Sequence, residues 1–164
     1  MKKCAFPLMI LVVLCAAMLV MADEAETETE QYGLVPDTVT EYAKAYENIM
    51  IVDLANQHVY CCVKGEIIAD TDCVSGDLNN SPTPTGLYNV WYKRSDFYML
   101  GTYYAAYATF FNNGIAIHDA DAWRSEYGGD IYQRDGSHGC INTPRWFAEI
   151  VYNNSWIGTP VYVF

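Results

Sequence analysis

Beyond residue 48 the sequence is a succession of short runs of β-branched, aromatic and other apolar residues, each closed by turn residues. The first three runs are 49–52, 58–63 and 66–69, and Lys64-Gly65 predicts a tight β-hairpin turn between the second and the third. Later runs of the same kind are 87–92, 102–111, 115–117 and 161–164. Strands this short must pair and bury a face, so residues 49–164 are predicted to form one mainly β domain.

Two segments depart from this pattern and predict short helices. A Pro-Asp start within 35–48 precedes apolar residues and predicts a short helix there. Residues 144–152 begin with proline and carry apolar side chains at helical spacing, which predicts a second helix. The expected fold is therefore mainly β with one or two short helices.

The N-terminal residues are typical of an exported protein. Lys2 and Lys3 precede an uncharged, apolar run over 4–22. This pattern predicts a secretory signal or a membrane anchor over 1–22, with cleavage after Ala22 and retention as a span both open. We therefore expect an extracytoplasmic protein whose only membrane contact is through this segment.

The charge balance is acidic. The chain has 9 Lys and Arg against 20 Asp and Glu, a formal net charge of -11. Acidic residues concentrate in 23–30, which predicts an extended, self-repelling linker within 23–48. Nucleic-acid binding is excluded as an expectation, because few cations are available to replace the counterions around phosphates. An anionic partner would have to be met by a local arginine.

Cys140 differs from the other cysteines of the predicted domain. Cys61, Cys62 and Cys73 lie in or beside apolar runs and are expected to be buried as small hydrophobic residues. Cys140 instead lies in Gly-Ser-His-Gly-Cys-Ile-Asn, where small residues let backbone N–H groups approach a substrate. A thiol reacts as thiolate, so a nearby base is required. His118 could supply it from a neighbouring strand, although an inert cysteine beside a histidine by chance is an open alternative.

One set of motifs resembles a known family. His118 followed by Ser137-His138-Gly139-Cys140-Ile141-Asn142 resembles the active-site signature of the L,D-transpeptidases of the YkuD family. The turn Pro82-Thr83-Pro84-Thr85-Gly86 resembles the family's TPTG turn, and 51–54, 57–58 and 158–161 also match. The resemblance runs from Ile49 to Phe164. The interval between His118 and Ser137 is longer than is usual in the family.

The resemblance implies a sandwich-like L,D-transpeptidase catalytic domain that acts on peptidoglycan stem peptides. It implies that Cys140 attacks the amide after the third residue of a donor stem and forms a thioester. An amine of a neighbouring stem then gives a 3→3 cross-link, whereas water gives L,D-carboxypeptidase trimming. His118 is implied as the base, the Ser137 carbonyl as its orienting group, and the Gly139 and Cys140 N–H groups as oxyanion donors. The resemblance implies no cofactor or metal. It also implies that carbapenems can acylate Cys140.

Four further residues are candidates for substrate contact: His138, Asn142, Tyr107 and Arg124. Arg124 could hold a stem carboxylate in a bidentate pair or form a surface salt bridge. Tyr107 could line the donor groove or belong to the core. Asn142 could brace the cysteine loop through its amide.

Three rival functions remain as alternatives. A zinc hydrolase could draw its ligands from His118, Asp119, Asp121, His138 and Cys140, but no HExxH or CxxC motif is present. Papain-like peptidases have the cysteine before the histidine in chain order, and here the histidine comes first. A non-catalytic wall-binding module would not need both His118 and Cys140.

Overall fold

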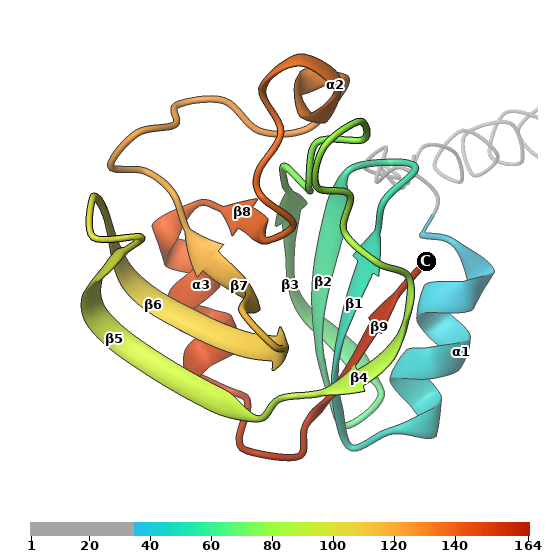
Figure 1. Ribbon diagram of the computed structural model, residues 1–164. Coiled ribbons are helices and arrows are strands. Elements are labelled where there is room, and N and C mark those ends of the chain that lie inside the picture. Colours follow the sequence, from blue (N-terminus) through green and yellow to red (C-terminus); the bar gives the residue numbers. More distant parts are fainter. Residues whose placement is uncertain (1–34) are drawn as a thin grey trace, which may run out of the picture. The chain divides into compact units, whose positions relative to one another are not determined.

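Two β-sheets dominate residues 35–164, the part of the chain that the computed structural model describes (Figure 1). The first sheet has the order β3-β2-β1-β9-β4, with β1 (Asn48–Asp53), β2 (His58–Val63), β3 (Glu66–Asp72), β4 (Gly86–Asn89) and β9 (Pro160–Val163). The second has the order β5-β6-β7-β8, with β5 (Tyr92–Met99), β6 (Tyr103–Asn112), β7 (Ile115–Asp119) and β8 (Ile141–Thr143). The predicted mainly β, sandwich-like fold is confirmed.

Parallel pairing of β7 and β8 determines which residues are neighbours in the second sheet. β8 runs parallel to β7, with Ile117 opposite Ile141 and His118 opposite Asn142. Parallel neighbours need a crossover connection, and here it is the long loop between residues 120 and 140. This loop returns the chain so that the segment containing Cys140 lies next to the strand containing His118.

The main core fills the space between the two sheets. It is built from buried residues of both sheets and of a C-terminal helix: Met50, Val52, Val59, Cys61, Cys73, Val90, Phe111, Ile117, Ile141, Phe147, Val151, Val161 and Val163. Cys61, Cys62 and Cys73 are buried free thiols, as expected. Their burial raises the pKa of the Cys61 and Cys62 thiols to about 12, so both stay protonated and inert.

Both expected helices form. α1 (Asp37–Ala45) and α3 (Arg145–Asn153) each follow a proline at the N-cap, which suits the first turn of a helix. A third helix, α2 (Ile131–Asp135), is a short addition in the loop between β7 and β8, with no buried residue to give it an apolar pattern. α3 packs against β6 and β7 on one face of the second sheet (Figure 1).

Residues 35–48 contain the short helix expected there, and it packs on the first sheet. They belong to the same compact unit as the sheets, because α1 buries Val39 and Ala43 against Ile49 and Ile51 of β1. The leader expected over 1–22 and the acidic run over 23–30 lie outside the described residues. Among the helices that the structure describes, none combines the length and apolarity needed to cross a membrane.

Candidate active site

Cys140 and His118 come from neighbouring strands on one face of the second sheet. Because Ile117 pairs with Ile141, Cys140 lies opposite Ala116, one residue before β8. Residues two apart in a strand point to the same face, so Ala116 and His118 share their face with Cys140 and Asn142. Their face is opposite the one covered by α3, whose partners Ile117 and Ile141 lie in the core.

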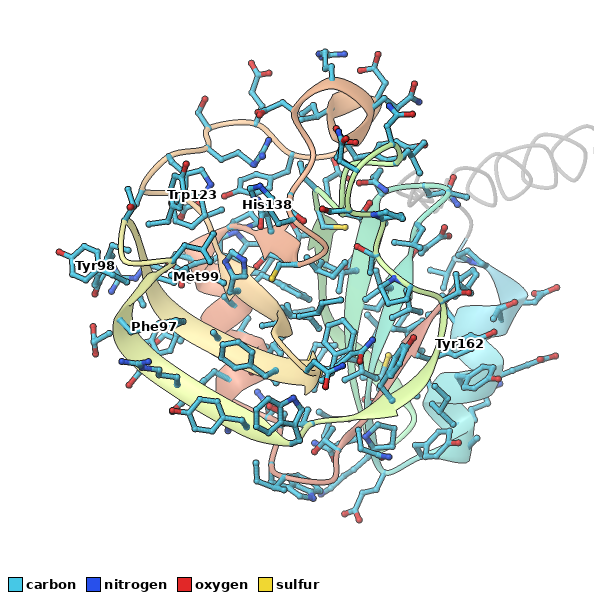
Figure 2. All side chains as sticks on the ribbon, viewed as in Figure 1. Phe97, Tyr98, Met99, Trp123, His138 and Tyr162 are labelled. Carbon is cyan, nitrogen blue, oxygen red and sulfur yellow. The ribbon has the colours of Figure 1, made fainter. Side chains whose placement is uncertain are left out.

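A cavity of about 280 Å³ opens on this face. Its lining comes from the β5–β6 turn, β7, the β7–β8 loop and the cysteine loop: Met99, Leu100, Tyr103, Gly114, His118, Trp123, Arg124, Asp135, Gly136, Ser137, His138, Cys140 and Asn142. Figure 2 shows Met99, Trp123 and His138 grouped beside the second sheet at this place. The structure thus brings six of the eight candidate residues into one cavity.

His118 is a buried, neutral imidazole with a fixed tautomer. Its Nδ1 lies 2.9 Å from the backbone oxygen of Asp119. A carbonyl accepts hydrogen bonds and cannot donate them, so Nδ1 carries the proton and Nε2 is left as the basic atom. The Trp123 ring packs 5.9 Å from the imidazole. Burial lowers the pKa of His118 below its ordinary value, although the Asp119 carbonyl and carboxylate oppose this shift.

The Asp119 carbonyl therefore replaces the expected orienting group. The Ser137 carbonyl, expected to hold His118, instead accepts the backbone N–H of Asp77 at 2.9 Å. The reason is that Ser137 forms an isolated parallel β-bridge with Gly76, and this bridge turns the Ser137 carbonyl away from β7. Sequence alone could not reveal this partner, because Asp77 is 60 residues away along the chain.

Cys140 rests as a protonated thiol. Its Sγ lies 3.7 Å from the backbone oxygen of Gly114, which places the thiol hydrogen toward that carbonyl. Burial raises the pKa of the Cys140 thiol to about 11, and a backbone contact with Ala116 opposes the shift in part. Because both members of the pair are uncharged at rest, the site must generate the thiolate by proton transfer during the reaction.

Ser137 holds the cysteine loop in a tight turn. Its Oγ donates to the Cys140 carbonyl at 2.5 Å and accepts the Gly139 N–H at 3.0 Å. The Gly139 N–H, expected as an oxyanion donor, is therefore used inside the loop in this structure. Gly139 itself has a φ of 103°, which a residue with a Cβ would adopt only with strain.

Thr83, from the Pro82–Gly86 motif, supports the same loop. Its hydroxyl donates to the Gly139 carbonyl at 2.8 Å and accepts the Gly76 N–H at 2.9 Å. The chains approach so closely here that a Cβ on Gly76 would lie 2.9 Å from the Gly139 Cα and 2.8 Å from the Thr83 nitrogen. The motif, identified in the sequence as a rigid turn, thus acts as a bracket for the cysteine loop.

Gln57 extends this bracket into the core. Its fully buried amide donates to the Ser75 hydroxyl at 2.9 Å and accepts the Ser75 N–H at 2.9 Å. Ser75 in turn accepts the Ser137 N–H through its carbonyl at 2.9 Å. Because buried polar groups are costly when unpaired, this chain fixes the position of Ser137 relative to β2.

Arg124 lies in the cavity rather than on the open surface. Its side chain is only 8% exposed, and its guanidinium pairs with the Asp135 carboxylate at 3.1 Å and with the Asp135 carbonyl at 2.9 Å. The Arg124 Nε is buried without a hydrogen-bond partner among the described residues. His138 is exposed beside it, whereas Asn142 is buried and its backbone pairs with Val74.

Tyr107 does not belong to the cavity. It neighbours Ala108 on β6, and Ala108 is the residue paired with His118. Strand alternation therefore sends Tyr107 to the opposite face, where its hydroxyl donates to Glu149 of α3 at 3.1 Å and its ring packs 5.4 Å from Tyr152. The aromatic run carried no signal that separates its two faces, because both are apolar.

Met99, Leu100, Tyr103 and Trp123 are cavity residues that sequence reasoning missed. The first three lie at the tip of the β5–β6 hairpin, where Leu100 is 80% exposed and adopts a positive φ of 49°. Trp123 connects the hairpin tip to the catalytic histidine, since its ring packs 5.1 Å from Tyr103 and also against His118. A Leu-Gly pair between two aromatic runs was the available signal for an exposed hairpin turn.

The metal alternative finds no support in the arrangement of side chains. Asp119 Oδ1 accepts the Tyr107 N–H at 2.7 Å, while the His118 ring faces the cavity. Within residues 35–164, no three His, Cys, Asp or Glu side chains are grouped as metal ligands would be.

Comparison with known protein families identifies the family of this domain. A model of the YkuD family, described as the L,D-transpeptidase catalytic domain, matches residues 47–163. The chain belongs to this family. The match includes both sheets, the Thr83 bracket and the loop that carries Cys140.

Solved L,D-transpeptidases share the fold. The catalytic domain of the Enterococcus faecium enzyme, solved by NMR, is 40% identical over 73% of this chain and 98% of that one, with a TM-score of 0.64. The same domain acylated by ertapenem is 38% identical over 72% and 97%, with a TM-score of 0.62. A crystallised mutant of the E. faecium enzyme is 38% identical over 73% of this chain and 50% of that one, with a TM-score of 0.65.

This L,D-transpeptidase domain thus spans half the length of the crystallised E. faecium chain. A search of curated protein sequences finds no match to it.

Proposed function

We propose that this domain is a peptidoglycan L,D-transpeptidase that forms 3→3 cross-links through a thioester on Cys140. The observation that carries the proposal is the pairing of β7 with β8, which puts Cys140 and a tautomer-fixed His118 into one cavity of a transpeptidase fold. The acidic linker and apolar leader of the sequence support a place outside the cytoplasmic membrane, where peptidoglycan lies.

Acylation begins with proton transfer from the Cys140 thiol to Nε2 of His118. The sulfur then attacks the carbonyl carbon of the third stem residue, and the carbonyl oxygen takes up the negative charge. Collapse of this adduct breaks the amide bond, and the His118 imidazolium gives its proton to the leaving amine of the D-amino acid. The product is a thioester, with no net change in charge.

Deacylation reverses these roles. An acceptor amine loses a proton to the neutral His118 and attacks the thioester carbon, so that a new amide forms and the thiol is regenerated. Water attacking the same thioester yields a tripeptide stem, the L,D-carboxypeptidase alternative. The Asp119 carbonyl supports both half-reactions, because it stabilises the imidazolium that each of them forms transiently.

Arg124 would meet the anionic end of the donor. We assign it the terminal carboxylate of the stem, since the guanidinium lines the cavity and keeps donors beyond those that Asp135 occupies. The Asp135 side chain is exposed and can swing away when a substrate carboxylate replaces it. Without such a cation, an acidic domain would repel an anionic stem.

Carbapenems would acylate Cys140 by the same chemistry. The E. faecium catalytic domain is known as its ertapenem acyl-enzyme, and this chain shares its fold and 38% of its residues in the aligned part. The strained lactam offers the Cys140 sulfur an activated carbonyl carbon in place of the stem amide. Intact mass measured after carbapenem treatment should increase by one inhibitor, and no adduct should form on a Cys140→Ala variant.

The deciding experiment incubates residues 31–164 with a disaccharide-tetrapeptide and analyses the products by mass spectrometry. Dimers formed with loss of D-alanine, and absent with Cys140→Ala, would establish L,D-transpeptidation. Tripeptide alone would identify a carboxypeptidase. No turnover together with a Cys140 that resists thiol reagents would contradict both activities and favour a non-catalytic wall-binding module.

A further inference from the structure

A band of aromatic side chains crosses the cavity face of the second sheet next to the catalytic cysteine. We call Trp91, Tyr92, Phe97 and Phe110 the aromatic strip. Neighbouring rings are in contact, with centroids 5.5 Å apart for Trp91–Tyr92 and Tyr92–Phe110 and 6.3 Å apart for Phe97–Phe110. Trp91 and Tyr92 are 53% and 43% exposed, so their rings offer open surface to a partner.

Strand register puts the strip in line with Cys140. Tyr92 pairs with Phe110, Phe110 pairs with Ala116, and Cys140 lies opposite Ala116. These four residues therefore form one row across β5, β6, β7 and the start of β8, all on the cavity face. With strands about 4.8 Å apart, Tyr92 lies roughly 14 Å from Cys140 along this row.

Trp91 is anchored to the β6–β7 turn, which borders the cavity. Its indole N–H donates to the Asn113 carbonyl at 3.1 Å, and its backbone N–H donates to the Phe110 carbonyl at 3.0 Å. The residue after Asn113 is Gly114, which lines the cavity and accepts the Cys140 thiol contact. The indole is thus fixed to the turn that borders the cavity, so the strip begins at the cavity rim and runs away from the reactive sulfur.

The 14 Å spacing matches the chemistry of the substrate. In the proposed reaction, three residues separate the reacting carbonyl from the sugar that carries the stem. Three extended residues span about 10 Å, and the linking group adds a little more. A stem with its third carbonyl at Cys140 that runs along the row would place its sugar over Tyr92 and Trp91.

The strip also has the composition that a sugar chain requires. Sugar rings present C–H groups with partial positive charge, and these pack on the electron-rich faces of aromatic rings. Arg94 lies on the same face, paired with Ala108 beside His118, and its guanidinium is 4.7 Å above the Phe97 ring. This cation lies on β5, two residues from Tyr92, where it can meet the side carboxylate of a stem that runs along the strip.

We propose that the aromatic strip binds the glycan strand that carries the donor stem, so that this domain recognises its substrate by sugar as well as by peptide. The inference rests on the proposed transpeptidation for the position of the stem. The inference predicts that the domain prefers stems attached to sugar over free stem peptides.

The test compares a disaccharide-tetrapeptide with the free tetrapeptide as donors. We expect Trp91→Ala with Tyr92→Ala to lower kcat/KM for the sugar-bearing donor about tenfold, a loss of the size that one or two stacked rings supply. The value for the free tetrapeptide should change less than about twofold. The matched control is Trp146→Ala, an exposed aromatic residue of α3 on the opposite face of the second sheet, which should leave the preference intact.

Equal losses for both donors, or a wild-type domain with no preference for sugar, would overturn the inference. Trp91→Phe, which keeps a ring, should retain part of the preference, and Tyr92→Ala alone provides the test where the double variant does not fold. Sedimentation that shows a dimer dissociated by the strip variants would identify the strip as an interface between copies instead.

A binding measurement separates this inference from the proposed function. Cys140→Ala protein is titrated with stem-free glycan strands, and tryptophan fluorescence is recorded with and without Trp91. Binding that is lost with Trp91→Ala supports the strip even where no donor is turned over. Turnover of stems combined with no glycan binding supports the transpeptidase and overturns the strip.

Discussion

At the scale of single residues, the reactive pair rests uncharged, and this sets its pH dependence. Burial lowers the pKa of His118, which must be neutral to accept the thiol proton, and raises the pKa of Cys140 to about 11. We expect kcat/KM for acylation to rise with pH through a midpoint below 6.5 and to stay level from there into the alkaline range. Stopped-flow acylation by a carbapenem between pH 5 and 10 measures this profile.

A different outcome would reveal a different resting state. An acid limb centred near the ordinary thiol pKa, at about 8.5, would mean that the free thiolate is the reacting species and that His118 does not take the proton. Alkylation by iodoacetamide supplies the control. In residues 31–164, Cys140→Ala should resist labelling, since the remaining cysteines, Cys61, Cys62 and Cys73, are buried.

We expect Trp123 to influence the basicity of His118. Its ring packs 5.9 Å from the imidazole, and burial is the largest cause of the lowered His118 pKa. Trp123→Ala should let water in, so the His118 pKa rises toward 6.5 and the acid limb of the pH profile moves to higher pH. Trp123→Phe should keep most of the wild-type profile. A lower kcat/KM with an unshifted midpoint would show that Trp123 contacts substrate and does not tune the base.

At the scale of elements, the cysteine loop depends on the segment between β3 and β4. Thr83→Val removes the hydroxyl that joins Gly76 to Gly139 and leaves two buried backbone groups unpaired. We expect a loss of about 2 kcal/mol in stability and a larger proportional loss in acylation rate, because the loop that holds Cys140 loosens. Thr83→Ser keeps the hydroxyl and should restore both. Denaturant unfolding and carbapenem acylation measure the two effects, and an unchanged acylation rate in Thr83→Val would contradict the bracket.

The strands and loops also show which features the sequence could predict and why it could not predict the others. The first hairpin was predictable, and Lys64-Gly65 turns β2 into β3 with positive φ at both residues, as the hairpin prediction required. The single strand predicted over 87–92 is wrong, because β4 ends at Asn89 and Tyr92 begins β5 in the other sheet. The pairing of Cys140 with His118 followed from a motif. The carbonyl that orients His118 did not, because backbone direction at Asp119 and Ser137 is set by long-range pairing that residue types do not encode. Tyr107 failed for a related reason: which face of an all-apolar strand meets the cavity depends on register alone.

At the scale of the whole molecule, the two sheets differ in function. The first sheet and α1 form a separate apolar cluster on the side away from the core, built around Val39, Ile49 and Ile51. The second sheet carries the cavity, the aromatic strip and, on its other face, α3. The first sheet and α1 therefore contribute stability without lining the cavity, and the core between the sheets and the Gln57 and Thr83 hydrogen bonds join them to the second sheet.

This division predicts that α1 can be removed at a cost in stability but not in chemistry. A chain that begins at Asn48 lacks the helix and exposes the cluster that Val39 and Ala43 cover. Re-exposing that apolar surface should cost about 3 kcal/mol, which lowers Tm by roughly 10 °C relative to a chain that begins at Val35. The acylation rate of the folded fraction should stay unchanged, because none of the residues that line the cavity belongs to α1. Val39→Asp in the longer chain should reproduce the loss, whereas Glu41→Ala, on the exposed side of the helix, should not. Equal Tm values for the two chains would mean that the first sheet is stable with its outer face bare, and that α1 is an accessory rather than a layer of the domain.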